Sequence, residues 1–141
     1  MTTTKQIRNL TKDKIISCAM NHLAENGLAQ LSMRKIANEL NVQVSALYNH
    51  FAQKQALIIA LQNHYLSSSE HFSAINFAAP SWQDFIRSIA NTTRNEFLKH
   101  PFALELFTSH SSESKASILH FEKYLGKMLE FGFTLNHAAQ I

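Results

Sequence analysis

Two short helical patterns joined by a tight turn, between Leu31 and Lys54, constrain the fold of this chain more than any other feature of its sequence. Ser32 precedes the first pattern as a helix N-cap, and Leu31 and Ile36 have the spacing of a hydrophobic staple. Asn41 ends this pattern, because asparagine tolerates the left-handed backbone conformation that a sharp turn between helices requires. The stretch therefore predicts a helix, a turn and a second helix.

The second pattern has one apolar edge and one edge of small or hydrogen-bonding side chains. Leu47 and Phe51 are one helical turn apart, and they predict the buried edge of a helix about two turns long. The opposite edge is predicted to carry Val44, Ser45, Tyr48 and Asn49. An uncharged edge that is rich in hydrogen-bonding groups suits the major groove of DNA better than a protein core.

Three motifs in the run RKIANELNVQVSALYNHFAQKQALIIAL carry a family resemblance: R-K-x-A-x-x-L-x-V, L-Y-x-H-F and K-x-A-L. With them, the chain up to about residue 65 resembles the DNA-binding domain of the tetracycline-repressor (TetR) family. Asn41 stands where this family usually has glycine, and it keeps the required backbone freedom. The resemblance implies an all-α fold. A three-helix helix-turn-helix domain would span residues 1–53, a helix over 54–69 would connect it, and residues 70–141 would form a ligand-binding and dimerisation core, incomplete relative to the family.

The resemblance also implies which residues contact DNA. Four positions of the second helix would lie nearest the bases: Val44, Ser45, Ala46 and Asn49. Phosphates would be held by Tyr48, His50 and Lys54, and by the start of the preceding helix at Ser32 and Met33. Arg34 would reach a base edge, where arginine can make a bidentate contact with guanine. The alternative is that all of these are solvated residues of an ordinary helical bundle.

The distribution of charge agrees with a DNA-binding end. Residues 1–60 hold seven Lys and Arg against three Asp and Glu, a balance of +4, whereas residues 61–141 hold six against seven, a balance of −1. The basic excess therefore lies with the helix-turn-helix, as expected of an electrostatic footprint for phosphates. The asymmetry supports the interpretation of this end as the one that binds DNA.

Bulk composition limits the class of protein. Three glycines and two prolines in 141 residues favour long helices, and the single cysteine, Cys18, excludes an internal disulfide. No run approaches the roughly 18 apolar residues of a membrane span, and the N-terminus has no apolar signal-peptide core. We therefore expect a cytoplasmic protein that does not associate with a membrane.

The second half predicts a helical core that would enclose an effector. Its segments SWQDFIR and GFTLNHA resemble the regulatory core of the same family, in which the helices surround an apolar cavity. An inward stripe is predicted to hold Trp82, Phe85, Ile86, Ile89 and Thr93, and the same pocket is expected to include Tyr65, Phe107 and His110. Phe107 stands where the drug-binding members have a histidine that ligates the drug-bound magnesium. We therefore expect a small, mainly apolar effector, with no metal and no cofactor.

These features predict a bacterial transcriptional repressor that an effector releases from its double-stranded DNA operator. The family acts as homodimers, but its usual dimerisation helices would follow Ile141. We therefore expect either a homodimer through another face or a truncated product with an exposed apolar flank. A protein-interaction module is the alternative: a shortened paralogue that binds full-length family members. An enzyme is not expected, because the sequence has no Ser-His-Asp order, no H-E-x-x-H and no phosphate-binding loop.

Overall fold

The computed structural model describes residues 10–68, 70, 72–109 and 114–140, and at residue 72 the backbone alone. All regular structure in these ranges is helical, which confirms the all-α prediction. The elements in chain order are α2 (Lys12–Asn26), η1 (Leu28–Gln30), α3 (Met33–Glu39), α4 (Val44–Tyr48), α5 (Lys54–Ser68), η2 (Phe72–Ala74), α6 (Trp82–Lys99), α7 (Pro101–Thr108), α8 (Lys115–Glu130) and α9 (Leu135–Ala138). None of the helices described is long and apolar enough to cross a membrane.

Local signals in the sequence set the ends of the first helices. The Thr11 hydroxyl accepts a hydrogen bond from the backbone N–H of Lys14 (3.2 Å) and caps α2, which ends at Gly27 with a φ of 77°. The Ser32 hydroxyl caps α3 in the same way, at 3.2 Å from the backbone nitrogen of Lys35. The cap at Ser32 falls where the sequence predicts it.

The turn between α3 and α4 has the expected left-handed residue. Asn41 has a φ of 54°; its N–H donates to the carbonyl of Asn38 (3.0 Å), and that of Val42 donates to the carbonyl of Ala37 (3.0 Å). This pair of hydrogen bonds is a Schellman motif, which satisfies the last carbonyls of a helix. The second helix is shorter than predicted: α4 has five residues and its last turn tightens, with the His50 N–H on the Leu47 carbonyl (2.9 Å).

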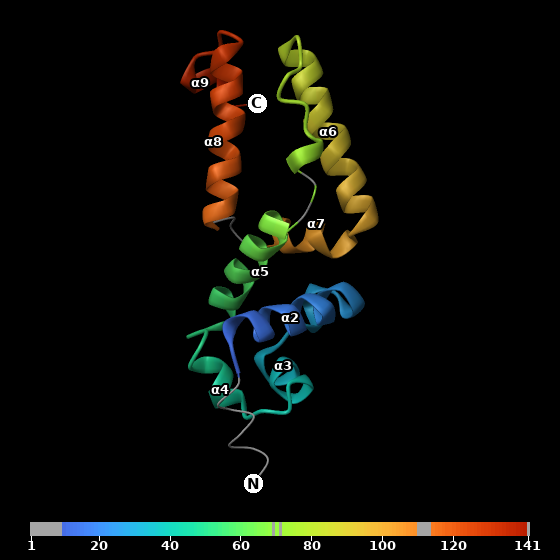
Figure 1. Cartoon of the computed structure of the whole chain (residues 1–141), viewed down its shortest axis with the longest axis vertical. Coiled ribbons are helices and arrows are strands. Elements are labelled where there is room, and N and C mark those ends of the chain that lie inside the picture. Colours follow the sequence, from blue (N-terminus) through green and yellow to red (C-terminus); the bar gives the residue numbers. More distant parts are fainter. Residues whose placement is uncertain (1–9, 69, 71, 110–113, 141) are drawn as a thin grey trace.

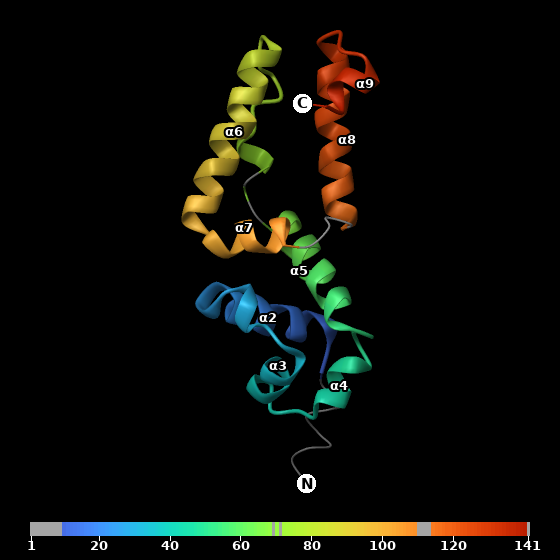
Figure 2. The same cartoon turned by 180° about the vertical axis from the view of Figure 1, so that it is seen from behind.

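One apolar core joins the helix-turn-helix to the rest of the molecule. Leu57, Ile58 and Leu61 of α5 are buried in the same cluster as the residues of α2 and α3, and Ala103 and Leu106 of α7 join them. Figures 1 and 2 show α5 leaving the helix-turn-helix toward α7, which lies below α6. The core therefore continues past residue 53, and the predicted domain boundary there stays a prediction.

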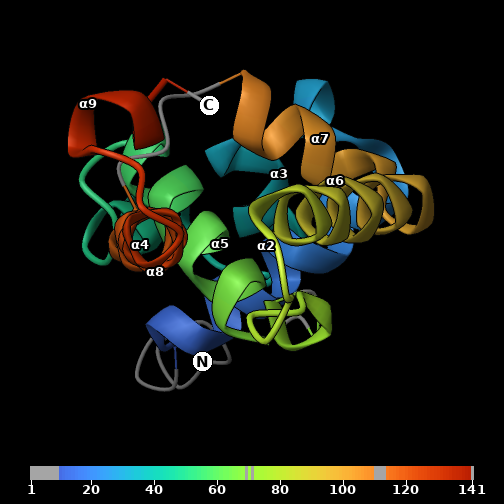
Figure 3. The same ribbon diagram turned by 90° about the horizontal axis from the view of Figure 1, so that it is seen from above.

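Helices α6 and α8 extend away from the helix-turn-helix as two arms, α6 from α7 and α8 from beside α5 (Figure 1), and Figure 3 shows α8 end-on. A second, smaller apolar cluster holds the arms near their far ends, around Phe85 of α6 and Met128 of α8, and Ala138 of α9 completes it. Serine and threonine caps begin α6 and α9 too: the Ser81 hydroxyl accepts from Asp84 N–H (3.2 Å) and the Thr134 hydroxyl from His137 N–H (3.4 Å). Nearer α7, the side chains between α6 and α8 do not belong to this second cluster.

Candidate DNA-binding surface and effector pocket

The outward edge of α4 presents neutral hydrogen-bonding groups. Ser45, Tyr48 and Asn49 are exposed, with 48% of the Tyr48 surface accessible, while His50 is half-buried. Leu47 and Phe51 lie in the core, so the apolar edge of the helix faces inward as predicted. An exposed edge of hydroxyl and amide groups can donate to and accept from base edges in a groove.

The structure corrects three of the positions assigned to this surface. The side chains of Met33 and Ala46 are only 4% and 6% exposed, and that of Val44 is half-buried against the core. Val44 and Ala46 lie on the inward side of α4, and Met33 lies in the core at the start of α3. Their side chains are therefore not presented to a base, although the backbone N–H of Met33 still belongs to the start of α3.

Basic side chains flank this edge. Arg34 and Lys35 lie in the first turn of α3, Lys54 begins α5, and all three are exposed. The ammonium group of Lys35 donates to the Gln30 side-chain oxygen (2.5 Å). Figure 1 places α3, α4 and the start of α5 at the same end of the molecule. These positions fit phosphates on either side of a groove.

A polar contact braces α2 against α3 behind this surface. The His22 Nδ1 atom lies 2.5 Å from Glu39 Oε1, and the Cys18 thiol donates to Glu39 Oε2 at 3.3 Å. Burial acts to raise the pKa of Glu39, but the hydrogen bonds from His22 and Cys18 outweigh it and leave that pKa lowered. The sequence did not indicate this contact, because its three residues come from two helices.

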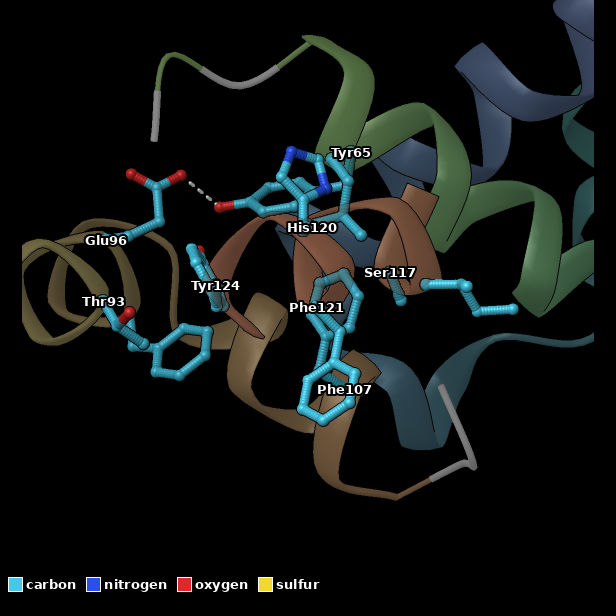
Figure 4. Close-up of a pocket in the computed structure, with 11 residues that line it drawn as sticks. Tyr65, Thr93, Glu96, Phe107, Ser117, His120, Phe121 and Tyr124 are labelled. Carbon is cyan, nitrogen blue, oxygen red and sulfur yellow. Dashed lines mark hydrogen bonds between the residues drawn. The ribbon is translucent and has the colours of Figure 1, made fainter. Parts of the chain in front are cut away.

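A cavity of about 480 Å³ lies among α5, α6, α7 and α8 (Figure 4). Its walls are mostly apolar and aromatic, and they include Tyr65, Thr93 and Phe107 from the predicted effector pocket. The volume lies within the range of small-molecule sites. These three predicted residues therefore lie in one cavity.

The rest of the predicted pocket lies elsewhere. Phe85, Ile86 and Ile89 belong to the second apolar cluster, and Trp82, which is 39% exposed, packs edge-on against Phe133 with ring centroids 5.6 Å apart. The reason is the length of α6: its first turns pack against the far end of α8, and only its last turns approach α5 and α7. His110 lies outside the described residues.

The sequence missed the polar groups of this cavity, which include Glu96, Ser117 and His120. The Tyr65 hydroxyl donates to Glu96 Oε1, and Figure 4 shows the two side chains facing one another. Burial, and then the neighbouring carboxylate, raises the pKa of Tyr65, so that hydroxyl keeps its proton. The spacing offered one signal: Glu96 follows Thr93 by three residues and so lies on the same helix face.

The Tyr65 ring ties the cavity to α7. It packs edge-on against Phe102 (ring centroids 5.7 Å apart) and at a tilt against Phe107 (6.0 Å). On α8, burial raises the pKa of Tyr124 to about 12. Both tyrosines therefore act in the pocket as neutral hydroxyls on aromatic rings.

Known proteins share this arrangement. Residues 15–61 match the family of bacterial regulatory proteins described as tetR family. The tetracycline repressor protein class D of Escherichia coli is 30% identical over 126 residues, which cover 89% of this chain and 57% of that repressor. The chain thus spans little more than half the length of this relative.

Solved structures agree with both the sequence match and the fold. A possible TetR family transcriptional regulator from Streptomyces coelicolor A3(2) matches with a TM-score of 0.78 and 26% identity, covering 92% of this chain and 63% of that one. The protein BioQ, solved with its natural double-stranded DNA operator, matches with a TM-score of 0.72 and 27% identity, covering 92% and 76%. The chain belongs to the TetR family of bacterial regulatory proteins.

Proposed function

We propose that this chain represses transcription by inserting α4 into the major groove of an operator, and that an effector in the cavity among α5 to α8 releases it. The exposed, uncharged edge of α4 between basic side chains carries this proposal, because base reading needs neutral hydrogen-bonding groups and phosphates attract the flanking cations. The relatives support it, since one is named a repressor and another was solved with its operator.

Each exposed residue has a separate role in this proposal. Ser45 and Asn49 would read base edges, and Arg34 would contact guanine from the start of α3. Tyr48, Lys54 and His50 would hold phosphates on either side of the major groove. The start of α3 at Ser32 would hold a further phosphate.

The connection from effector to DNA would pass through α5. Its first half is buried in the core of the helix-turn-helix, and its second half carries Tyr65 into the cavity. A ligand that displaces Tyr65 would therefore tilt α5 and move α4 with it. Since the two ends share one helix, the response needs no separate hinge.

The test compares Arg34→Ala with Arg94→Ala. Both arginines are exposed and both substitutions remove one positive charge, but Arg94 lies on α6. Fluorescence anisotropy would use the duplex that the wild-type chain selects from a pool of random palindromes, at two salt concentrations. We expect Arg34→Ala to weaken binding about tenfold or more and to relax preference at one base pair, because a bidentate guanine contact is lost.

Arg94→Ala should stay close to wild type in the same assay, and wild-type affinity should fall steeply as salt rises. If both variants lose the same DNA affinity, then Arg34 acts only through its positive charge and makes no specific base contact. A wild-type chain that selects no duplex would reject the regulator proposal.

A second candidate function, a module that binds another TetR-family protein, is favoured by exposed apolar side chains on α8. Ile118, Leu119 and Phe121 are about half exposed, at 52%, 48% and 52%. Such side chains suit a protein interface, and in the first proposal they would serve a homodimer. Light scattering with and without operator DNA separates the two: a DNA-bound homodimer supports the repressor, whereas a chain that ignores DNA but pairs with a longer family member supports the module.

A further inference from the structure

One acidic group, Glu96, lies on the wall of the effector cavity, and no lysine or arginine among the described residues forms an ion pair with it. Glu96 is half-buried on the wall, and among the described residues it forms no ion pair. Among the described residues, the lining contains no lysine or arginine, and its one basic side chain is His120. A carboxylate held beside apolar surface is unfavourable unless a positive charge or several hydrogen bonds compensate it.

The neighbouring polar groups do not form an ion pair with Glu96 among the described residues. The Tyr65 hydroxyl donates one hydrogen bond to Glu96 Oε1 and, being neutral, leaves the negative charge in place. The His120 Nδ1 atom lies 2.7 Å from the carbonyl of Ala116 and so donates to its own helix. The carboxylate therefore remains a negative centre at one side of the cavity. Figure 4 shows Glu96 and Tyr65 together on that side.

The rest of the wall suits an apolar body with a positive centre. The rings of Phe107 and Phe121 lie away from the carboxylate in Figure 4, and the Tyr65 and Tyr124 rings lie nearer to it. Aromatic faces attract ammonium groups as well as apolar surface. The same wall would disfavour an anion, since nothing among its described residues offers a lysine or an arginine.

We propose that the effector is a lipophilic monocation, an organic amine or quaternary ammonium with an aromatic or branched aliphatic body, whose positive centre lies against Glu96. This assignment rests on the proposed function, because it names the effector class of the same cavity. It replaces the mainly apolar effector expected from the sequence with an amphiphilic one. Binding would compete with the Tyr65 hydroxyl for the carboxylate and so act on α5.

The test is isothermal titration calorimetry on the whole chain, without DNA, using two probes that share a naphthylmethyl body. One is trimethyl(1-naphthylmethyl)ammonium and the other is the neutral 1-naphthylmethanol. The variant Glu96→Gln keeps an acceptor for Tyr65 but removes the charge. Glu122→Gln, an exposed glutamate on α8 outside the cavity wall, removes the same charge and serves as the control.

We expect the wild type and Glu122→Gln to bind the cation at least about tenfold more tightly than the neutral probe, and Glu96→Gln to lose this preference. Circular dichroism should show the same helix content in all three proteins. Equal affinity for the two probes, an unchanged preference in Glu96→Gln, or no binding of either probe would each overturn the assignment.

The outcome is separable from that of the proposed function. A chain that binds operator DNA but shows no preference for the cation refutes the effector class alone. A chain that binds the cation through Glu96 but binds no DNA refutes the proposed repressor function, while the cavity remains a site for lipophilic cations.

Discussion

Cys18 illustrates how one neighbour changes the chemistry of a residue. Its half-buried thiol donates to Glu39 at 3.3 Å, and burial, followed by that carboxylate, raises the pKa of Cys18 to about 11. The raised pKa means that the folded state favours the neutral thiol. The contact therefore stabilises the helix-turn-helix at neutral pH, and its contribution is lost as the pH rises toward 11.

We predict that iodoacetamide alkylates Cys18 at pH 8 at least about tenfold more slowly in the folded chain than in urea, because only the thiolate reacts. The rate in the folded chain should keep rising between pH 8 and 10. Since the sequence has one cysteine, mass spectrometry of the whole chain reads this residue directly. Glu39→Gln should speed the reaction, and equal rates in the folded and unfolded chains would contradict the raised pKa.

The turn between α3 and α4 depends on a single backbone conformation. Asn41 has a φ of 54°, a value that a β-branched side chain adopts only with strain. We predict that Asn41→Val lowers the free energy of unfolding by about 1–2 kcal/mol and that Asn41→Gly changes it by less than about 1 kcal/mol. Urea unfolding followed by circular dichroism measures both.

The control for this prediction is Asn38→Val, an exposed position inside α3. Asn38→Val should lower the free energy of unfolding less than Asn41→Val does, because the helical conformation accommodates valine at a small penalty. If Asn38→Val and Asn41→Val destabilise equally, the left-handed turn does not limit stability.

At this scale the sequence predicts what local chemistry decides. The cap at Ser32 and the left-handed turn at Asn41 depend on neighbours within a few residues, so they were predicted correctly. The burial of Ala46 depends on how α4 docks, which no local pattern records. The cavity is a stronger case, because Glu96 and Tyr65 come from different helices and meet only after α5 and α6 have packed.

Two helices, α5 and α7, contact both the cavity and the helix-turn-helix. Phe107 on α7 lines the cavity, while two residues earlier the Glu105 carboxylate accepts a hydrogen bond from the backbone N–H of Leu28 at 3.0 Å. Leu28 follows Gly27, where α2 ends. A shift of α7 in response to an effector would therefore pull directly on the start of the α2–α3 connection.

We predict that Glu105→Ala weakens the coupling between effector binding and DNA binding without abolishing either binding activity. The α4 surface does not contain Glu105, so operator affinity without effector should stay within about threefold of wild type, whereas the factor by which a saturating effector weakens DNA binding should fall about fivefold or more. Anisotropy titrations with operator DNA, with and without the cationic probe, measure this factor. Glu122→Ala, which removes an exposed carboxylate from α8, should leave it unchanged. If Glu105→Ala lowers operator affinity equally with and without the probe, then the Glu105–Leu28 contact stabilises the fold but transmits no signal, and the coupling passes through α5 alone.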